Sequence, residues 1–172
     1  MVSPATKRSS KQVATAYFEG IAARDLDAMV EQWASGGIDH FYGMADLKAP
    51  EGVREFFGEM FRAVPDFSMS VTDMVAYGEK AAVRWGATGT FNGEGKLQGV
   101  APTGARLNLE GLDLLTIRDG LIQENFAYTN GMEMARQMGI MPPMGSPGDR
   151  AMMGAMNVKT AATARLQKLT GR

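Results

Sequence analysis

The sequence predicts an α+β fold, in which helices near the start of the chain cover one face of a curved antiparallel sheet. Two observations predict this fold. Three segments of the first half carry apolar residues at helical spacing, whereas the second half carries long β-forming runs separated by turn residues. A further helical pattern follows the last strand, so we expect a C-terminal helical extension.

The three expected helices differ in how clearly their ends are marked. Apolar residues from Val13 to Ala22 recur at helical spacing and predict a helix that begins near Ser10, after a frayed tail of residues 1–9. Asp25 is a typical N-cap for a second helix, which carries Trp33 and ends at a Gly pair. A third helix is expected between Pro50 and Pro65.

Five segments have the composition and alternation of strands. They are residues 38–42, 67–77, 82–91, 106–117 and 121–128. Asp119-Gly120 separates the last two, and it predicts a tight type I′ hairpin turn because Gly accepts a positive φ without steric cost. The last four strands should therefore form an antiparallel sheet.

Composition excludes several classes of protein. The 172 residues are 45% apolar and 22% charged with a net charge of −1, which is typical of one globular domain and does not favour nucleic acid or a membrane as a partner. Cys is absent and no apolar signal segment opens the chain, so we expect a cytoplasmic protein. One His and no Cys also argue against a metal site, and no nucleotide-binding motif is present.

The end of the chain differs in composition from the rest. Eight of the 14 Met residues lie between Met132 and Met156, and residues 146–172 carry a net charge of +4. One interpretation is a helix that packs on its own domain or on a second copy. The other is a Met-rich cover over a pocket, because Met adapts to irregular shapes.

A strand that ends in His is followed along the chain by the motifs PDF, AVRW, GxxPTG, EGLDL, RDGLIQE and a final QMG. The order of these motifs resembles the SnoaL-like polyketide cyclases of the nuclear transport factor 2-like superfamily, and the resemblance covers residues 10–141, with residues 142–172 as the extension. It implies a cone-shaped barrel with three helices over the concave face of the sheet, a deep apolar pocket and frequent dimers. It also implies aldol cyclisation of a hydrophobic carbonyl compound without a cofactor.

One position departs from the family pattern. The family places its acid/base Asp after an aromatic residue near the end of the last strand, and the resemblance puts Asn130 there. An amide cannot take up a proton near neutral pH. Whether the protein is an enzyme is therefore left open, and a non-catalytic small-molecule binding protein or an assembly module on the same fold are the alternatives.

The candidate catalytic residues are His40, Arg84 and Asn130. His40 is the natural proton shuttle near neutrality, and Arg84 and Asn130 could hold substrate oxygens. A comparison with limonene epoxide hydrolases, whose strand carries Arg-x-Asp, favours the Arg84 face of its strand as the pocket side. The structural alternatives are a hydrogen-bonded position in the core or at the rim for His40, and an ion pair inside the barrel between Arg84 and Glu110 or Glu124.

Further residues are expected to line the pocket and contact a small hydrophobic ligand: Tyr17, Trp33, Tyr42, Thr88, Glu110, Leu112, Phe126 and Tyr128. Of the strand carboxylates Glu110 and Asp113, only one can face the cavity, because alternate residues point to opposite faces. The opposite face would carry Val83, Trp85, Ala87, Leu115 and Ile117. Such an apolar face should not stay in water, so we expect a homodimer.

Overall fold

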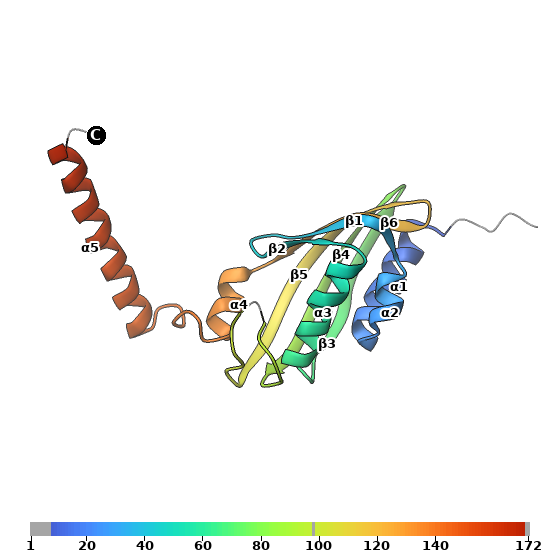
Figure 1. Ribbon diagram of the computed structural model, residues 1–172, viewed down its shortest axis with the longest axis horizontal. Helices are drawn as coiled ribbons and strands as arrows, with labels where there is room; N and C mark the ends of the chain where they lie inside the picture. Colours follow the sequence, from blue (N-terminus) through green and yellow to red (C-terminus); the bar gives the residue numbers. More distant parts are fainter. Residues whose placement is uncertain (1–7, 98, 171–172) are drawn as a thin grey trace, which may run out of the picture.

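The structure is a computed structural model that describes residues 8–97 and 99–170, and side chains up to residue 167. Three helices lie together on one side of a curved, unclosed six-stranded sheet (Figure 1). The strand order is β2-β1-β6-β5-β4-β3. The α+β fold predicted from the sequence is confirmed, whereas most of the expected frayed tail, residues 1–7, lies outside the described residues.

The three helices begin close to the residues expected from the sequence. Helix α1 (Ser10–Ala23) opens with a capping box between Ser9 and Gln12. Helix α2 (Leu26–Val30) is capped by the carboxylate of Asp25, which accepts from two backbone N–H groups. Helix α2 is shorter than expected because Trp33 already belongs to the first strand. Helix α3 (Glu51–Ala63) follows Pro50 and buries Val53, Phe57 and Phe61.

The strands are β1 (Trp33–Phe41), β2 (Ala45–Lys48), β3 (Ser68–Tyr77), β4 (Lys80–Phe91), β5 (Ala105–Arg118) and β6 (Leu121–Thr129). The turn between β5 and β6 has positive φ at both Asp119 and Gly120, as predicted for type I′. The short edge strand β2 was not predicted from the sequence. The parallel pairing of β1 and β6 was not predicted either, because it joins residues far apart in the chain.

The two faces of the sheet have opposite environments. We call the face covered by α1 and α3 the inner face and the other the outer face. The core lies between the inner face and the helices, and it includes Tyr17, Phe57 and Trp85. The outer face leaves large apolar side chains in water, among them Tyr42, Leu112 and Tyr128.

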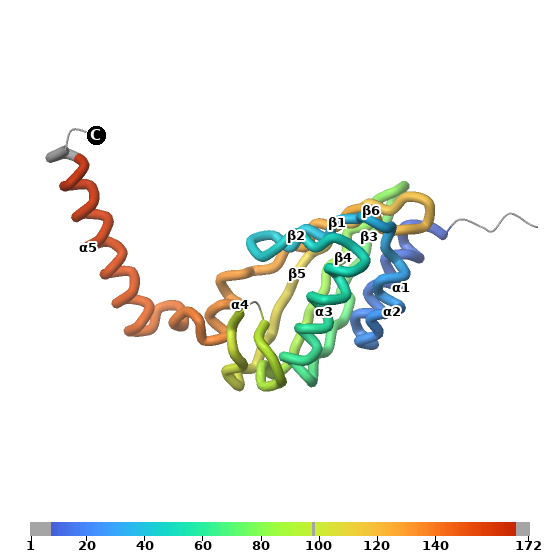
Figure 2. The backbone as a smooth tube through the Cα atoms, in the orientation of Figure 1, coloured from blue at the N-terminus to red at the C-terminus, as the bar shows by residue number. Residues whose placement is uncertain are grey.

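Two helices follow the sheet. Helix α4 (Gly131–Gln137) packs near β5, and α5 (Pro147–Thr170) points away from the body, as the chain trace in Figure 2 shows. An ion pair between Arg136 and Asp149 joins α4 to the start of α5 at 3.6 Å. The expected packing of the last helix on its own domain is therefore not observed among the described residues, where α5 is mostly exposed.

Candidate functional site

A cavity of about 300 Å³ lies between the helices and the inner face of the sheet. Its wall is almost wholly apolar. The described residues that line it are Phe18, Ile21, Phe41, Met44, Phe56, Phe57, Met60, Val64, Phe67, Met69, Trp85, Ala87, Thr88, Gly89, Leu97, Val100, Leu107, Leu109, Asp113, Thr129, Met134, Met138 and Ile140. Asp113 is the one ionisable side chain among them, so any proton transfer to a ligand by the described wall depends on it.

Asp113 reaches the cavity because β5 presents it on the inner face, where it is only 5% exposed. Trp85 holds it there, since the indole Nε1 donates to Asp113 Oδ1 at 2.7 Å. The indole fits because Gly111 lies directly opposite Trp85 in the β4–β5 register. A Cβ atom on Gly111 would come within 2.1 Å of the indole ring.

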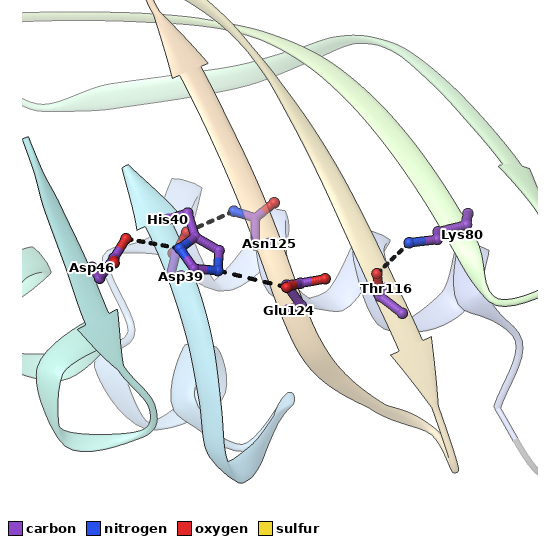
Figure 3. Close-up of polar contacts among 7 residues, drawn as sticks. All are labelled: Asp39, His40, Asp46, Lys80, Thr116, Glu124 and Asn125. Atoms are coloured by element: carbon purple, nitrogen blue, oxygen red, sulfur yellow. Dashed lines mark hydrogen bonds and ion pairs between the residues drawn. The ribbon is translucent and has the colours of Figure 1, made fainter. Parts of the chain in front are cut away.

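Asn125 connects Asp113 to a second buried carboxyl group. Its Nδ2 donates to Asp113 Oδ2 at 2.7 Å and to Asp39 Oδ1 at 2.9 Å. Parallel pairing of β1 and β6 puts Asp39 beside Asn125, and Figure 3 shows this contact between the two strands. On its other side, Asp39 Oδ2 lies 3.4 Å from the hydroxyl of Tyr17 on α1. Asp39 and Asn125 are both fully buried.

Burial sets the proton affinity of both carboxyl groups. It raises the pKa of Asp113 to about 6, although the hydrogen bonds from Trp85 and Asn125 work in the opposite direction. Burial, followed by the charge of Asp113, raises the pKa of Asp39 well above its ordinary value. Asp113 therefore changes its charge close to neutral pH, which suits a general acid or base.

The outer face holds the residues that the sequence analysis placed in the pocket. His40 lies between two carboxylates there, with Nδ1 at 2.7 Å from Asp46 Oδ1 and Nε2 at 3.6 Å from Glu124 Oε1 (Figure 3). Arg84 forms an ion pair with Glu110 at 3.0 Å, and both side chains are more than half exposed. The prediction that the Arg84 face lines the cavity is therefore wrong.

Strand alternation explains why the opposite face of β4, and not the Arg84 face, lines the cavity. Val83, Trp85 and Ala87 form the more apolar side of β4, and burial of that side under the helices removes more apolar surface from water. Leu115 and Ile117 on β5 are buried with them. These five residues belong to the core, so they cannot form the dimer surface that the sequence analysis assigned to them.

The expected ligand-binding residues fall into three groups. Thr88 lines the cavity. Tyr17 and Trp33 are buried in the core, and Trp33 Nε1 has no hydrogen-bond partner among the described residues. The others lie on the outer face: Glu110, Leu112, and the aromatic residues Tyr42, Phe126 and Tyr128, where Tyr42 stacks on Tyr128 and Phe126 on His40.

Asn130 lies outside the cavity wall and caps α4. Its side-chain oxygen accepts from the backbone N–H of Glu133 at 3.1 Å. Asp and Asn are equally common at this position of a helix. The cap accounts for a short polar side chain at residue 130 without a catalytic role.

Asp39 and Asn125 were not among the site residues expected from the sequence. Asp39 directly precedes His40, the only His, and alternation sends the two side chains to opposite faces. If the more apolar side of each strand had been taken as the inner face, instead of the Arg84 side, then Asp39, Asp113 and Asn125 would have been predicted to lie on the inner face. Their convergence still depends on the parallel β1–β6 pairing, which no short-range motif signals.

The chain is similar to known proteins mainly through its fold. The structure resembles AclR, a proposed hydroxylase from Streptomyces galilaeus, with a TM-score of 0.67 at 20% identity over 92% of this chain and 96% of that one. It also resembles IdmH, a proposed polyketide cyclase from Streptomyces antibioticus, with a TM-score of 0.64 at 26% identity over 77% and 99% of the two chains.

A third similar structure is TerC co-crystallised with polyporic acid, with a TM-score of 0.61 at 14% identity over 76% of this chain and 98% of that one. No curated protein sequence matches the chain. The sequence model of the SnoaL-like polyketide cyclases matches residues 11–138, which is most of the chain. The chain therefore belongs to the SnoaL-like polyketide cyclase family.

Proposed function

We propose that the protein catalyses acid/base chemistry, without a cofactor, on an uncharged hydrophobic carbonyl compound bound in the inner cavity. The observation that carries this proposal is the position of Asp113, the one ionisable side chain among the described residues of an almost wholly apolar wall. Burial there raises its pKa to about 6. The family and the co-crystal of TerC with polyporic acid support a polyketide-like ligand. Asp113 replaces His40, Arg84 and Asn130 as the candidate catalytic residue.

The chemistry would begin with proton removal. The Asp113 carboxylate takes a proton from the carbon next to a carbonyl group, the C–H bond breaks, and its electron pair enters an enolate. The enolate carbon then forms a C–C bond with a second carbonyl carbon of the same molecule. The resulting alkoxide recovers the proton from Asp113, so the aldol cyclisation needs no other reactant. Trp85 and Asn125 fix the orientation of the carboxylate throughout.

The proposal can be tested without the natural substrate. We would incubate the protein with 2-tetralone, an uncharged bicyclic ketone, in D₂O and follow exchange of the α-protons by NMR. The natural protein should accelerate exchange, and Asp113→Asn should lose at least about 100-fold of that acceleration, as is usual for removal of a general base.

Asp46→Asn is the matched control, because it removes an outer-face carboxylate that contacts only His40 among the hydrogen bonds described. It should keep full exchange activity. Equal exchange by the natural protein and Asp113→Asn would contradict the proposal. Saturable binding of 2-tetralone without any accelerated exchange would favour the alternative, a non-catalytic binding protein.

Two further properties remain predictions. Exposed Tyr42, Leu112, Leu114 and Tyr128 on the outer face support a homodimer in place of the buried residues first expected there. No helix among the described residues is long and apolar enough to cross a membrane. A cytoplasmic location is proposed from the sequence alone.

A further inference from the structure

The buried polar cluster behind the cavity contains more acid groups than the chemistry above uses. Asp39 is fully buried and does not line the cavity, yet Asn125 connects it to Asp113. No Lys, Arg or His contacts either carboxyl group among the interactions of the described residues. Two negative charges in such a place would be strongly disfavoured.

We propose that Asp39 remains protonated and neutral at the pH at which Asp113 is ionised, so that the cluster keeps one negative charge and holds it at the cavity wall. In this state Asp39 acts through Asn125 as a positioning residue for Asp113. The inference deepens the proposed function, because it specifies the protonation state of the same site.

The hydrogen-bond donors explain why the charge resides on Asp113. Asp113 receives two short bonds, from Trp85 and Asn125, both of 2.7 Å. Asp39 receives one bond of 2.9 Å from Asn125 and has a longer contact of 3.4 Å with Tyr17. Since short bonds from N–H donors favour the ionised form, Asp113 loses its proton first.

Neutral Asp39 also uses every atom that it presents to the cluster. Its Oδ1 accepts one hydrogen of the Asn125 amide, and the other hydrogen of that amide goes to Asp113. In the structure the Tyr17 hydroxyl donates to Oδ2, and in the proposed state this contact reverses, so that the proton on Oδ2 is donated to the Tyr17 oxygen. The titratable groups that face Asp39 are thus Tyr17 from α1 and Asp113 from β5, while His40, its neighbour on β1, faces the other way.

The direct test is infrared spectroscopy of the natural protein with ¹³C-labelled Asp side chains, at about pH 7.5. The proposal predicts the band of one buried, protonated Asp carboxyl group. Asp39→Asn should remove this band and Asp113→Asn should keep it. Absence of any protonated band in the natural protein would overturn the proposal. Two such bands would also overturn it, because Asp113 would then be neutral as well.

The isosteric Asp39→Asn variant replaces a neutral group by a neutral group, so exchange of 2-tetralone should keep its pH profile. Asp39→Leu removes the acceptor for Asn125 and should shift the inflection of that profile to higher pH at an unchanged KM. A profile displaced to lower pH by Asp39→Asn would show that Asp39 carries charge and would refute the proposal. The infrared result does not depend on catalysis, so failure of the inference can be told from failure of the proposed function.

Discussion

The raised pKa of Asp113 makes a specific prediction about stability. A carboxyl group whose pKa is higher in the folded state than in the unfolded state binds its proton more tightly when folded. Its contribution to stability is therefore fully present below the unfolded pKa and is lost as the pH rises through the folded pKa. For Asp113 this window extends from its ordinary pKa of 3.8 to about 6.

The magnitude follows from the same two values. The difference between 3.8 and about 6 corresponds to a free energy of unfolding lower by about 3 kcal/mol above the window than below it. About 2 kcal/mol of that loss falls between about pH 4.5 and about pH 7.5. A loss of this size is a large part of the stability of an ordinary domain.

The assay is urea unfolding of the natural protein and of Asp113→Asn at several pH values across this range. The variant cannot titrate at residue 113, so the difference in unfolding free energy between the two proteins isolates this group. The natural protein should lose about 2 kcal/mol relative to the variant as the pH rises from about 4.5 to about 7.5. A difference that is independent of pH, or one that grows in favour of the natural protein, would refute the reasoning.

Three other outcomes are expected. Gly111→Ala should lower the free energy of unfolding by about 1–3 kcal/mol, because the new Cβ displaces the Trp85 indole. It should also slow 2-tetralone exchange, since Trp85 holds Asp113, and an unchanged exchange rate would contradict that role of Trp85. His40→Ala and Arg84→Ala should each leave 2-tetralone binding unchanged in calorimetry, because both side chains lie on the outer face. Leu114→Lys should shift the mass found by light scattering toward 18.5 kDa, whereas a natural protein already of that mass would contradict the dimer.

Local signals in the sequence were sufficient for most of the fold. The Asp25 cap, the Asp119-Gly120 turn and the apolar stripe of α3 act over a few residues, and each specifies its element almost independently of the rest. The short strand β2 had no comparable signal. It forms because β1 is beside it, so its existence depends on tertiary contacts.

The site was less predictable because it depends on which face of the sheet is covered. Arg84 and Trp85 are adjacent on β4, so their side chains point to opposite faces of the sheet. The choice of which of the two faces the pocket therefore decides the predicted face of every other residue on the strand. The comparison with limonene epoxide hydrolases favoured the Arg84 face as the pocket side, whereas the apolar side chains of the same strand favoured the Trp85 face. The Trp85 face is the one that is buried, because this removes more apolar surface from water. Asp39 and Asn125 are 86 residues apart, so their contact could not be derived from any local pattern.

The pH dependence of 2-tetralone exchange tests most directly whether Asp113 is the working acid/base group. The rate should rise with pH, show one inflection at about 6 and then level off, because the ionised carboxylate is the active form. Asp113→Asn should abolish the inflection together with the accelerated exchange. An unchanged profile in Asp113→Asn, combined with loss of the inflection in His40→Ala, would contradict the account and return the chemistry to the outer face.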